Sequence, residues 1–184
     1  MTDFFPSTKF FQKGYDQDAV NSFFEKAREA YEQNRQLSDF TSEHVRNAAF
    51  PMRRGGYDPA AVDAALDRME GAFVTRDRAD HVAVNGEQAW LNHVADRATT
   101  LYPRLVRPVG ERFAHPAKGK QGYDSLQVDD FLDRLGRFFD DEDTLTAEEV
   151  RHLTFKVAKG AEAYKEGPVD AYLSRVIEIL LAVE

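Results

Sequence analysis

One pattern occurs four times along the sequence, and this repeat constrains the fold more than any other feature. Each copy opens with a triplet, Gly14-Tyr15-Asp16, Gly56-Tyr57-Asp58, Gly122-Tyr123-Asp124, and a diverged fourth version that begins at Ala163-Tyr164. An apolar residue then follows at offsets of six, ten, thirteen and seventeen from the first residue of each copy. These ladder residues are Val20, Phe24, Ala27 and Tyr31; Val62, Leu66, Met69 and Phe73; Val128, Leu132, Leu135 and Phe139; and Val169, Leu173, Val176 and Leu180.

The ladder spacing predicts one α-helix per copy. Steps of four, three and four place the ladder residues on a single stripe of a helix. The aspartate of each full triplet stands at the N-cap position, and Pro59 follows Asp58 at the first helical position, where a missing N–H has no cost. We expect the triplet glycine to supply the positive φ of a tight turn, and the tyrosine ring to fold onto the new helix.

Helices of this length do not persist alone in water, so each apolar stripe needs a partner. The stripes could pair with one another inside the chain or with a second chain, which leaves a homodimer open. The first long helix is predicted from about Asp16 to near Leu37.

A longer duplication groups the four copies into two modules. Residues 145–155 match residues 40–50 position for position, and Thr146 with Glu149 forms a capping box that predicts a short helix. Phe5 and Phe113 each precede their triplet by nine residues. We therefore predict a first module at residues 1–76 and a second at 109–184, each running loop, long helix, short helix, loop, long helix.

The connecting segment, residues 77–108, has no counterpart in the rest of the chain. Its apolar periodicity predicts a helix that is interrupted at Asn85-Gly86 and ended by Pro103 and Pro108, with Trp90 contributed to a core. Apart from a weak strand signal in the basic loops, no strand alternation is present. The predicted fold class is all-α, a helical bundle of two tandem, internally duplicated modules.

Composition narrows the classes of partner and compartment. The net charge of −8 argues against nucleic acid, because binding to phosphates needs clustered Lys and Arg. Cysteine is absent, which excludes disulfides and thiolate metal sites and fits a reducing cytoplasm. We expect no signal peptide, because Met1 to Phe11 lack a basic start and a sustained apolar run, and no stretch has the ~20 apolar residues that a membrane span needs. We expect a cytoplasmic protein, either free or peripheral at the inner face of the cell membrane.

The sequence gives little support for catalysis. The histidines are scattered and none has the spacing of a metal site. The acidic run from Asp140 to Asp143 lacks the glycine and the terminal glutamate of a calcium loop. No phosphate-binding glycine loop or nucleophile elbow is present. We expect no enzymatic activity, no catalytic residue, no metal and no cofactor.

Positive charge precedes every copy of the repeat. Basic residues in such loops either balance an acidic protein in solvent or attract an anionic membrane, at roughly 1 kcal/mol per residue near the surface. Phe10 and Phe11 could add apolar burial to that attraction, or could belong to the core. The basic residues are Lys9, Lys13, Arg53, Arg54, Lys118, Lys120, Lys156 and Lys159.

The triplet, the Val128-Asp129-Asp130-Phe131-Leu132 helix start and the Leu-Thr-x-Glu-Glu-Val lead-in at residue 145 together resemble the DivIVA domain family. Members of this family are bacterial scaffolds of cell division and polar growth. The resemblance covers about residues 1–75 and 110–184, and it implies that an aromatic and a basic loop residue ahead of the triplet touch the membrane. By position these are Phe11 and Lys13, whereas the second and third copies lack the aromatic.

The resemblance implies a non-enzymatic scaffold or adaptor that works in cell division or polar envelope growth through an unidentified protein partner. The alternative is a peripheral membrane protein that binds anionic lipid through its loops. Both interpretations share one set of candidate loop residues, Phe10, Phe11, Lys13, Arg53, Arg54, Lys118 and Lys120.

Overall fold

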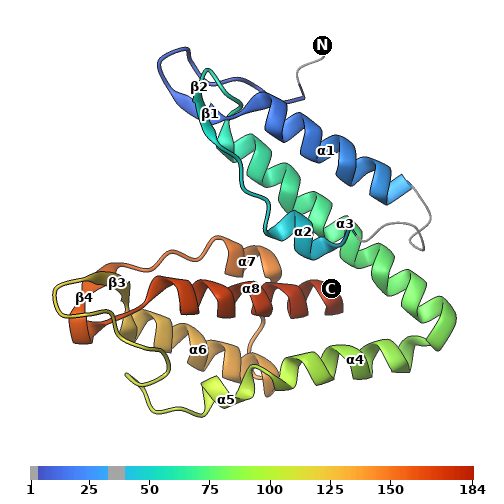
Figure 1. The fold of residues 1–184 in the computed structure, drawn as a ribbon. Helices are drawn as coiled ribbons and strands as arrows, with labels where there is room; N and C mark the ends of the chain where they lie inside the picture. Colours follow the sequence, from blue (N-terminus) through green and yellow to red (C-terminus); the bar gives the residue numbers. More distant parts are fainter. Residues whose placement is uncertain (1–3, 33–39) are drawn as a thin grey trace. The chain divides into compact units, whose positions relative to one another are not determined.

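The computed structural model describes residues 4–32 and 40–184, which form two compact units, residues 1–79 and 80–184 (Figure 1). The first unit contains β1 (Lys13–Tyr15), α1 (Gln17–Glu32), α2 (Ser42–Arg46), β2 (Met52–Arg54) and most of α3 (Pro59–Asn85). The second unit contains the end of α3, α4 (Glu87–Thr99), α5 (Tyr102–Leu105), β3 (Gln121–Asp124), α6 (Ser125–Phe139), α7 (Ala147–Arg151), β4 (Val157–Lys159), the 3-10 turn η2 (Gly160–Glu162), β5 (Ala163–Tyr164) and α8 (Glu166–Val183).

The four predicted ladder helices are α1, α3, α6 and α8, and their apolar stripes are confirmed as core. Every ladder residue except Tyr31 is buried or half-buried. The two short helices are confirmed as α2 and α7, and Thr146 with Glu149 makes the predicted capping box. The predicted end of the first helix near Leu37 lies outside the described residues.

The aspartate of each full triplet caps its helix as predicted. A side-chain oxygen accepts a hydrogen bond from a backbone N–H in the first turn, and this satisfies one of the unpaired donors of a helix start. In the fourth copy Lys165 takes this position and gives no side-chain cap. The capping pairs are Asp16 with Ala19 at 2.9 Å, Asp58 with Ala60 at 3.0 Å and Asp124 with Gln127 at 3.0 Å.

Removing one cap and adding the missing one should change stability in opposite directions. Asp124→Ala is expected to lower the free energy of unfolding by about 1 kcal/mol, because the N–H of Gln127 loses its acceptor. Lys165→Asp should raise it, since this variant supplies the cap that α8 lacks. Urea unfolding followed by circular dichroism measures both changes. A neutral result for Asp124→Ala would contradict the capping role.

The prediction of an all-α fold is wrong, because the chain also forms two small antiparallel sheets. β1 pairs with β2, and β3 lies between β4 and β5. Strands this short carry no visible alternation of apolar and polar residues, and they form because the backbones of paired repeats hydrogen-bond across each unit. In the first unit, Tyr15 N donates to Tyr57 O at 2.9 Å and Tyr57 N donates to Tyr15 O at 2.8 Å.

The predicted positive φ of the triplet glycines is also wrong. Gly14, Gly56 and Gly122 are not among the glycines with positive φ. Their lack of a side chain instead allows close contact between backbones. A Cβ atom on Gly14 would lie 2.2 Å from the carbonyl oxygen of Tyr57, and one on Gly122 would lie 2.0 Å from that of Tyr164.

Aromatic contacts across the repeats complete each core. In the first unit Phe5 packs edge-to-face on Tyr57, with ring centroids 5.5 Å apart, and in the second Phe113 packs in the same way on Tyr164 at 5.4 Å. The tyrosines of the opening triplets also contact the neighbouring repeat. Tyr15 lies against Phe50, and Tyr123 against Phe155.

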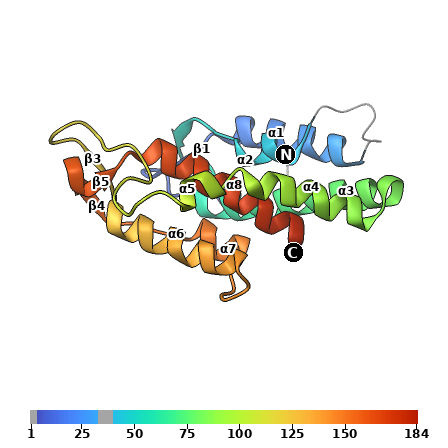
Figure 2. The same ribbon diagram turned by 90° about the horizontal axis from the view of Figure 1, so that it is seen from below.

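Most of the connecting segment belongs to the second unit. The break predicted at Asn85-Gly86 is confirmed, because α3 ends at Asn85 and Gly86 has a φ of 84°. After it, α4 runs along α8, as Figures 1 and 2 show from two directions. Trp90 of α4 is buried, and its indole N–H donates to the carbonyl oxygen of Ala182 at 3.0 Å.

Candidate functional site

An aromatic pair projects from the loop that leads into β1. Gln12 N donates to Lys9 O at 2.7 Å, which closes a turn with Phe10 and Phe11 at its centre. The two side chains are 76% and 88% exposed, and their rings contact each other edge-to-face with centroids 5.5 Å apart. They therefore do not belong to the core, which the sequence had left open. Apolar surface of this size at the end of a loop is available to a membrane or a partner.

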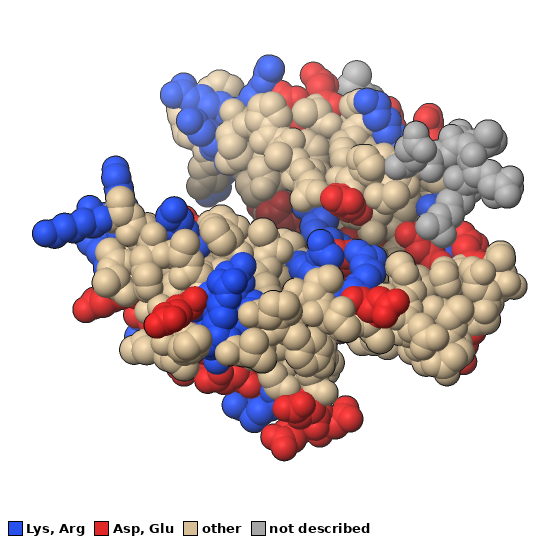
Figure 3. Space-filling view, turned by 60° about the horizontal axis from the view of Figure 1, so that its bottom comes forward, with Lys and Arg blue, Asp and Glu red and all other residues tan. Residues whose placement is uncertain are grey.

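Positive charge surrounds this aromatic pair. Lys13 of β1 stands directly opposite Arg54 of β2, and like charges at such a position repel each other. Arg53 is ion-paired with the capping carboxylate of Asp16. Within the described residues, no acidic partner is seen for Lys9, Lys13 or Arg54. We name Lys9–Lys13 together with Arg53 and Arg54 the aromatic-basic loop, whose charged side chains project in the upper left part of Figure 3.

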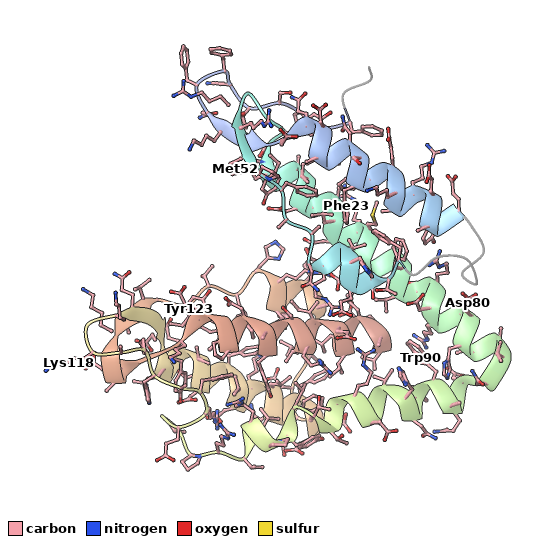
Figure 4. All side chains as sticks on the ribbon, viewed as in Figure 1. Phe23, Met52, Asp80, Trp90, Lys118 and Tyr123 are labelled. Carbon is pink, nitrogen blue, oxygen red and sulfur yellow. The ribbon has the colours of Figure 1, made fainter. Side chains whose placement is uncertain are left out.

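The loop that leads into β3 is basic but has no aromatic residue. Lys120 N donates to Ala117 O at 2.9 Å, so Lys118 lies within a turn at the end of the second unit, where Figure 4 labels it. On the neighbouring strand β4, the apolar residue Val157 is 62% exposed. This loop offers charge without the rings of the first unit.

The triplet residues have structural partners. Burial and the neighbouring Asp63 raise the pKa of Tyr15, whose hydroxyl bonds to that carboxylate. In the second unit burial and Asp170 raise the pKa of Tyr123 in the same way. In both units the opening tyrosine is thus tied to the second long helix. Together with the capping aspartates and the close glycine contacts, this assigns the triplets to folding.

The second unit contains a buried polar network that the sequence patterns do not predict. Asp129 of α6 is 1% exposed and accepts hydrogen bonds from the hydroxyl of Tyr164 at 3.0 Å and from Gly110 N at 2.7 Å. Arg112 is 6% exposed, its Nε lies 3.7 Å from the Asp129 carboxylate, and its Nη1 donates to the Asp129 carbonyl oxygen at 2.8 Å. It also forms an ion pair with Asp133.

Burial raises the pKa of Tyr164 to about 12, and the hydrogen bond and charge of Asp129 add to this rise, while the backbone N–H of Arg112 opposes it. The hydroxyl is therefore protonated at neutral pH and acts as a donor.

The sequence carried one signal for the network. Arg112 and Asp129 occupy the positions of Phe4 and Asn21 in the first module. The second module therefore has a basic and an acidic residue at two positions that are uncharged in the first module.

A pocket of about 370 Å³ lies between α7 and α8 of the second unit. Its polar lining includes Tyr123, Arg151 and Asp170. The Tyr123–Asp170 contact has a counterpart in Tyr15–Asp63, so we assign it to the fold rather than to chemistry. Across residues 4–32 and 40–184, no group of three or more histidine, cysteine, aspartate or glutamate side chains is placed to hold a metal ion.

In the part of the chain that the structure describes, no helix has both the length and the hydropathy needed to cross a membrane. Compared with known proteins, the chain matches no protein-family model, no curated protein and no solved structure.

Proposed function

We propose that this protein is a non-enzymatic adaptor that docks on an anionic membrane surface through its aromatic-basic loop. The observation that carries the proposal is the pair Phe10 and Phe11, which are 76% and 88% exposed on a turn among basic side chains. Burying two phenylalanine rings at a lipid interface gives an apolar gain, and each neighbouring cation adds roughly 1 kcal/mol of attraction. Stable peripheral binding needs two such contributions, here the apolar one and the electrostatic one.

The likeness to DivIVA domains supports a role at the inner face of a bacterial cell membrane, in cell division or polar envelope growth. In this role the protein is a cytoplasmic scaffold that links the membrane to a protein partner. The backbone on both sides of Phe10 and Phe11 is held by the turn that follows β2, because Thr8 N donates to Gly56 O at 2.8 Å and Gly55 N donates to Gln12 O at 3.0 Å. A loop whose backbone is already held in place loses less conformational freedom on binding, which favours the bound state.

Co-sedimentation with vesicles tests this function. The protein should bind vesicles of phosphatidylglycerol and phosphatidylcholine, and binding should weaken in about 0.5 M salt. Phe10→Ser with Phe11→Ser should lower the partition coefficient at least about tenfold, because the apolar contribution is lost. Val84→Ala is the matched control, since Val84 is 82% exposed outside the loop. Equal binding by the wild-type protein and the double variant would refute lipid docking through this loop.

A further inference from the structure

An apolar groove of about 460 Å³ runs between α1 and α3 in the first unit. Its floor is made by the ladder residues Phe24, Ala27, Met69 and Phe73, and by the small side chains Ala65 and Ala72. Phe4 and Tyr31 at its edges are 55% and 44% exposed. Small residues along a groove let a helix approach the backbone closely.

The repeat supplies a direct comparison, because the same face of the second unit is covered. There the segment α4–α5 lies over α6 and α8. The Tyr172 hydroxyl, at the position of Ala65, donates to Leu101 O at 3.2 Å. The ring of Phe139, at the position of Tyr31, stacks on Tyr102 with centroids 5.5 Å apart.

Burial differs between the two units at matching positions. Val176 and Ile179 are 1% and 4% exposed beneath the covering segment, whereas Met69 and Ala72 at the same positions of the first unit are only half-buried. Arg112, at the position of Phe4, is also buried, and its carbonyl oxygen accepts a hydrogen bond from Arg104 Nη1 at 2.6 Å. Among its described residues, the first unit thus has the same apolar face but no helix that covers it.

The charges at the rim define the chemistry of the missing helix. In the second unit Arg97 on the covering helix pairs with Glu178 on α8. In the first unit Gly71 replaces that glutamate and Arg28 replaces Gly136, while Arg68 matches Arg175 of the second unit. Both Arg28 and Arg68 line the groove, so this face has lost an acidic residue and gained a basic one. Arg28 is 2.7 Å from Glu32 but is strongly exposed. A covering helix therefore meets basic groups here, so acidic residues on it are favoured.

We propose that the groove between α1 and α3 binds an amphipathic helix of another protein, with apolar residues at i, i+4 and i+7 and acidic residues beside them. A second copy of this chain is a poorer occupant. In the described residues, most of the apolar stripes of α6 and α8 are already buried in their own unit. The inference deepens the adaptor role proposed above by giving the partner a binding site and a chemistry.

The test uses two helical peptides of about 16 residues on an alanine background, each with Trp, Leu and Leu at i, i+4 and i+7. One carries glutamates beside this stripe and the other carries lysines. The glutamate peptide should bind the full chain at least about tenfold more tightly, as measured by fluorescence anisotropy. Its binding should shift the NMR methyl signals of Ala27, Ala65 and Ala72.

Charge reversal supplies the decisive variant. Arg28→Glu with Arg68→Glu should reverse the preference, so that the lysine peptide binds more tightly than the glutamate peptide. The fold should be kept, because both arginine side chains are exposed and their replacement leaves the core intact. Lys26→Glu is the matched control, because it makes the same change on α1 outside the groove lining. No binding below about 1 mM, equal affinities, or methyl shifts elsewhere would each overturn the proposal.

Light scattering tests whether a second copy of this chain occupies the groove. A dimer of the wild-type chain that dissociates on Arg28→Glu with Arg68→Glu would identify a second copy as the occupant and would also overturn the proposal. Lipid and helix binding can be separated within one set of proteins. Phe10→Ser with Phe11→Ser should lose vesicle binding and keep peptide binding, whereas the arginine variant should keep vesicle binding and lose the glutamate peptide.

Discussion

Gly122→Ala is expected to lower the free energy of unfolding of the second unit by about 3 kcal/mol or more. The new methyl group would lie 2.0 Å from the carbonyl oxygen of Tyr164, and 3.0 Å from its carbonyl carbon. Neither atom belongs to a flexible side chain, so β3 and β5 would have to move apart. That movement weakens the pairing of Tyr123 with Tyr164 and disturbs the start of α6.

The chain offers a matched control for this substitution. Gly136 lies inside α6 of the same unit, and apart from its chain neighbours and the adjacent backbone of α6 no atom lies within 4 Å of the position that its Cβ would take. Gly136→Ala should therefore stabilise the unit by up to about 1 kcal/mol, because alanine favours the helix. Urea unfolding followed by the fluorescence of Trp90, the single tryptophan and a buried residue of this unit, measures both variants. Similar effects of the two substitutions would contradict the close-contact role of Gly122.

Local patterns explain why much of the helical framework could be predicted. A ladder such as Val128, Leu132 and Leu135 depends on spacing inside one helix, and a cap such as Asp124 acts on a residue three positions later. Neither of these features requires knowledge of which repeat lies beside which. Whether Phe10 and Phe11 lie in the core or in an exposed loop stayed open in the sequence, because spacing ahead of a triplet does not show which side chains are buried.

Features that depend on contacts between distant residues were missed or misassigned. The strands pair Gly14 with Arg53 and Gly122 with Ala158, and these short segments carry no period of their own. The glycine was assigned to a turn because a sequence shows the missing side chain but not the backbone that approaches it. The covering of α8 by α4 likewise depends on tertiary packing.

Asp129→Ala should be the second variant with a large effect, with a loss of about 3–5 kcal/mol in the unfolding of the second unit. Asp129 is the acceptor for Tyr164 and Gly110 and the more deeply buried of the two counter-ions of Arg112, the other being Asp133. Its removal would leave these donors inside the unit without that acceptor, and Arg112 would keep its ion pair with the part-exposed Asp133 but lose the buried one. Leaving a buried guanidinium without a buried counter-ion costs more than the ion pair itself contributes. Trp90 fluorescence in urea again measures the change.

Asp130→Ala is the matched control, because it removes the same charge one residue further along α6 at an exposed position, and its effect should stay within about 0.5 kcal/mol. Replacing the network with apolar groups, in Arg112→Met with Asp129→Leu and Tyr164→Phe, should recover much of the stability that Asp129→Ala loses. If Asp129→Ala is as mild as Asp130→Ala, the network does not stabilise the second unit. If the triple variant is less stable than Asp129→Ala alone, the loss comes from packing and not from an unpaired charge.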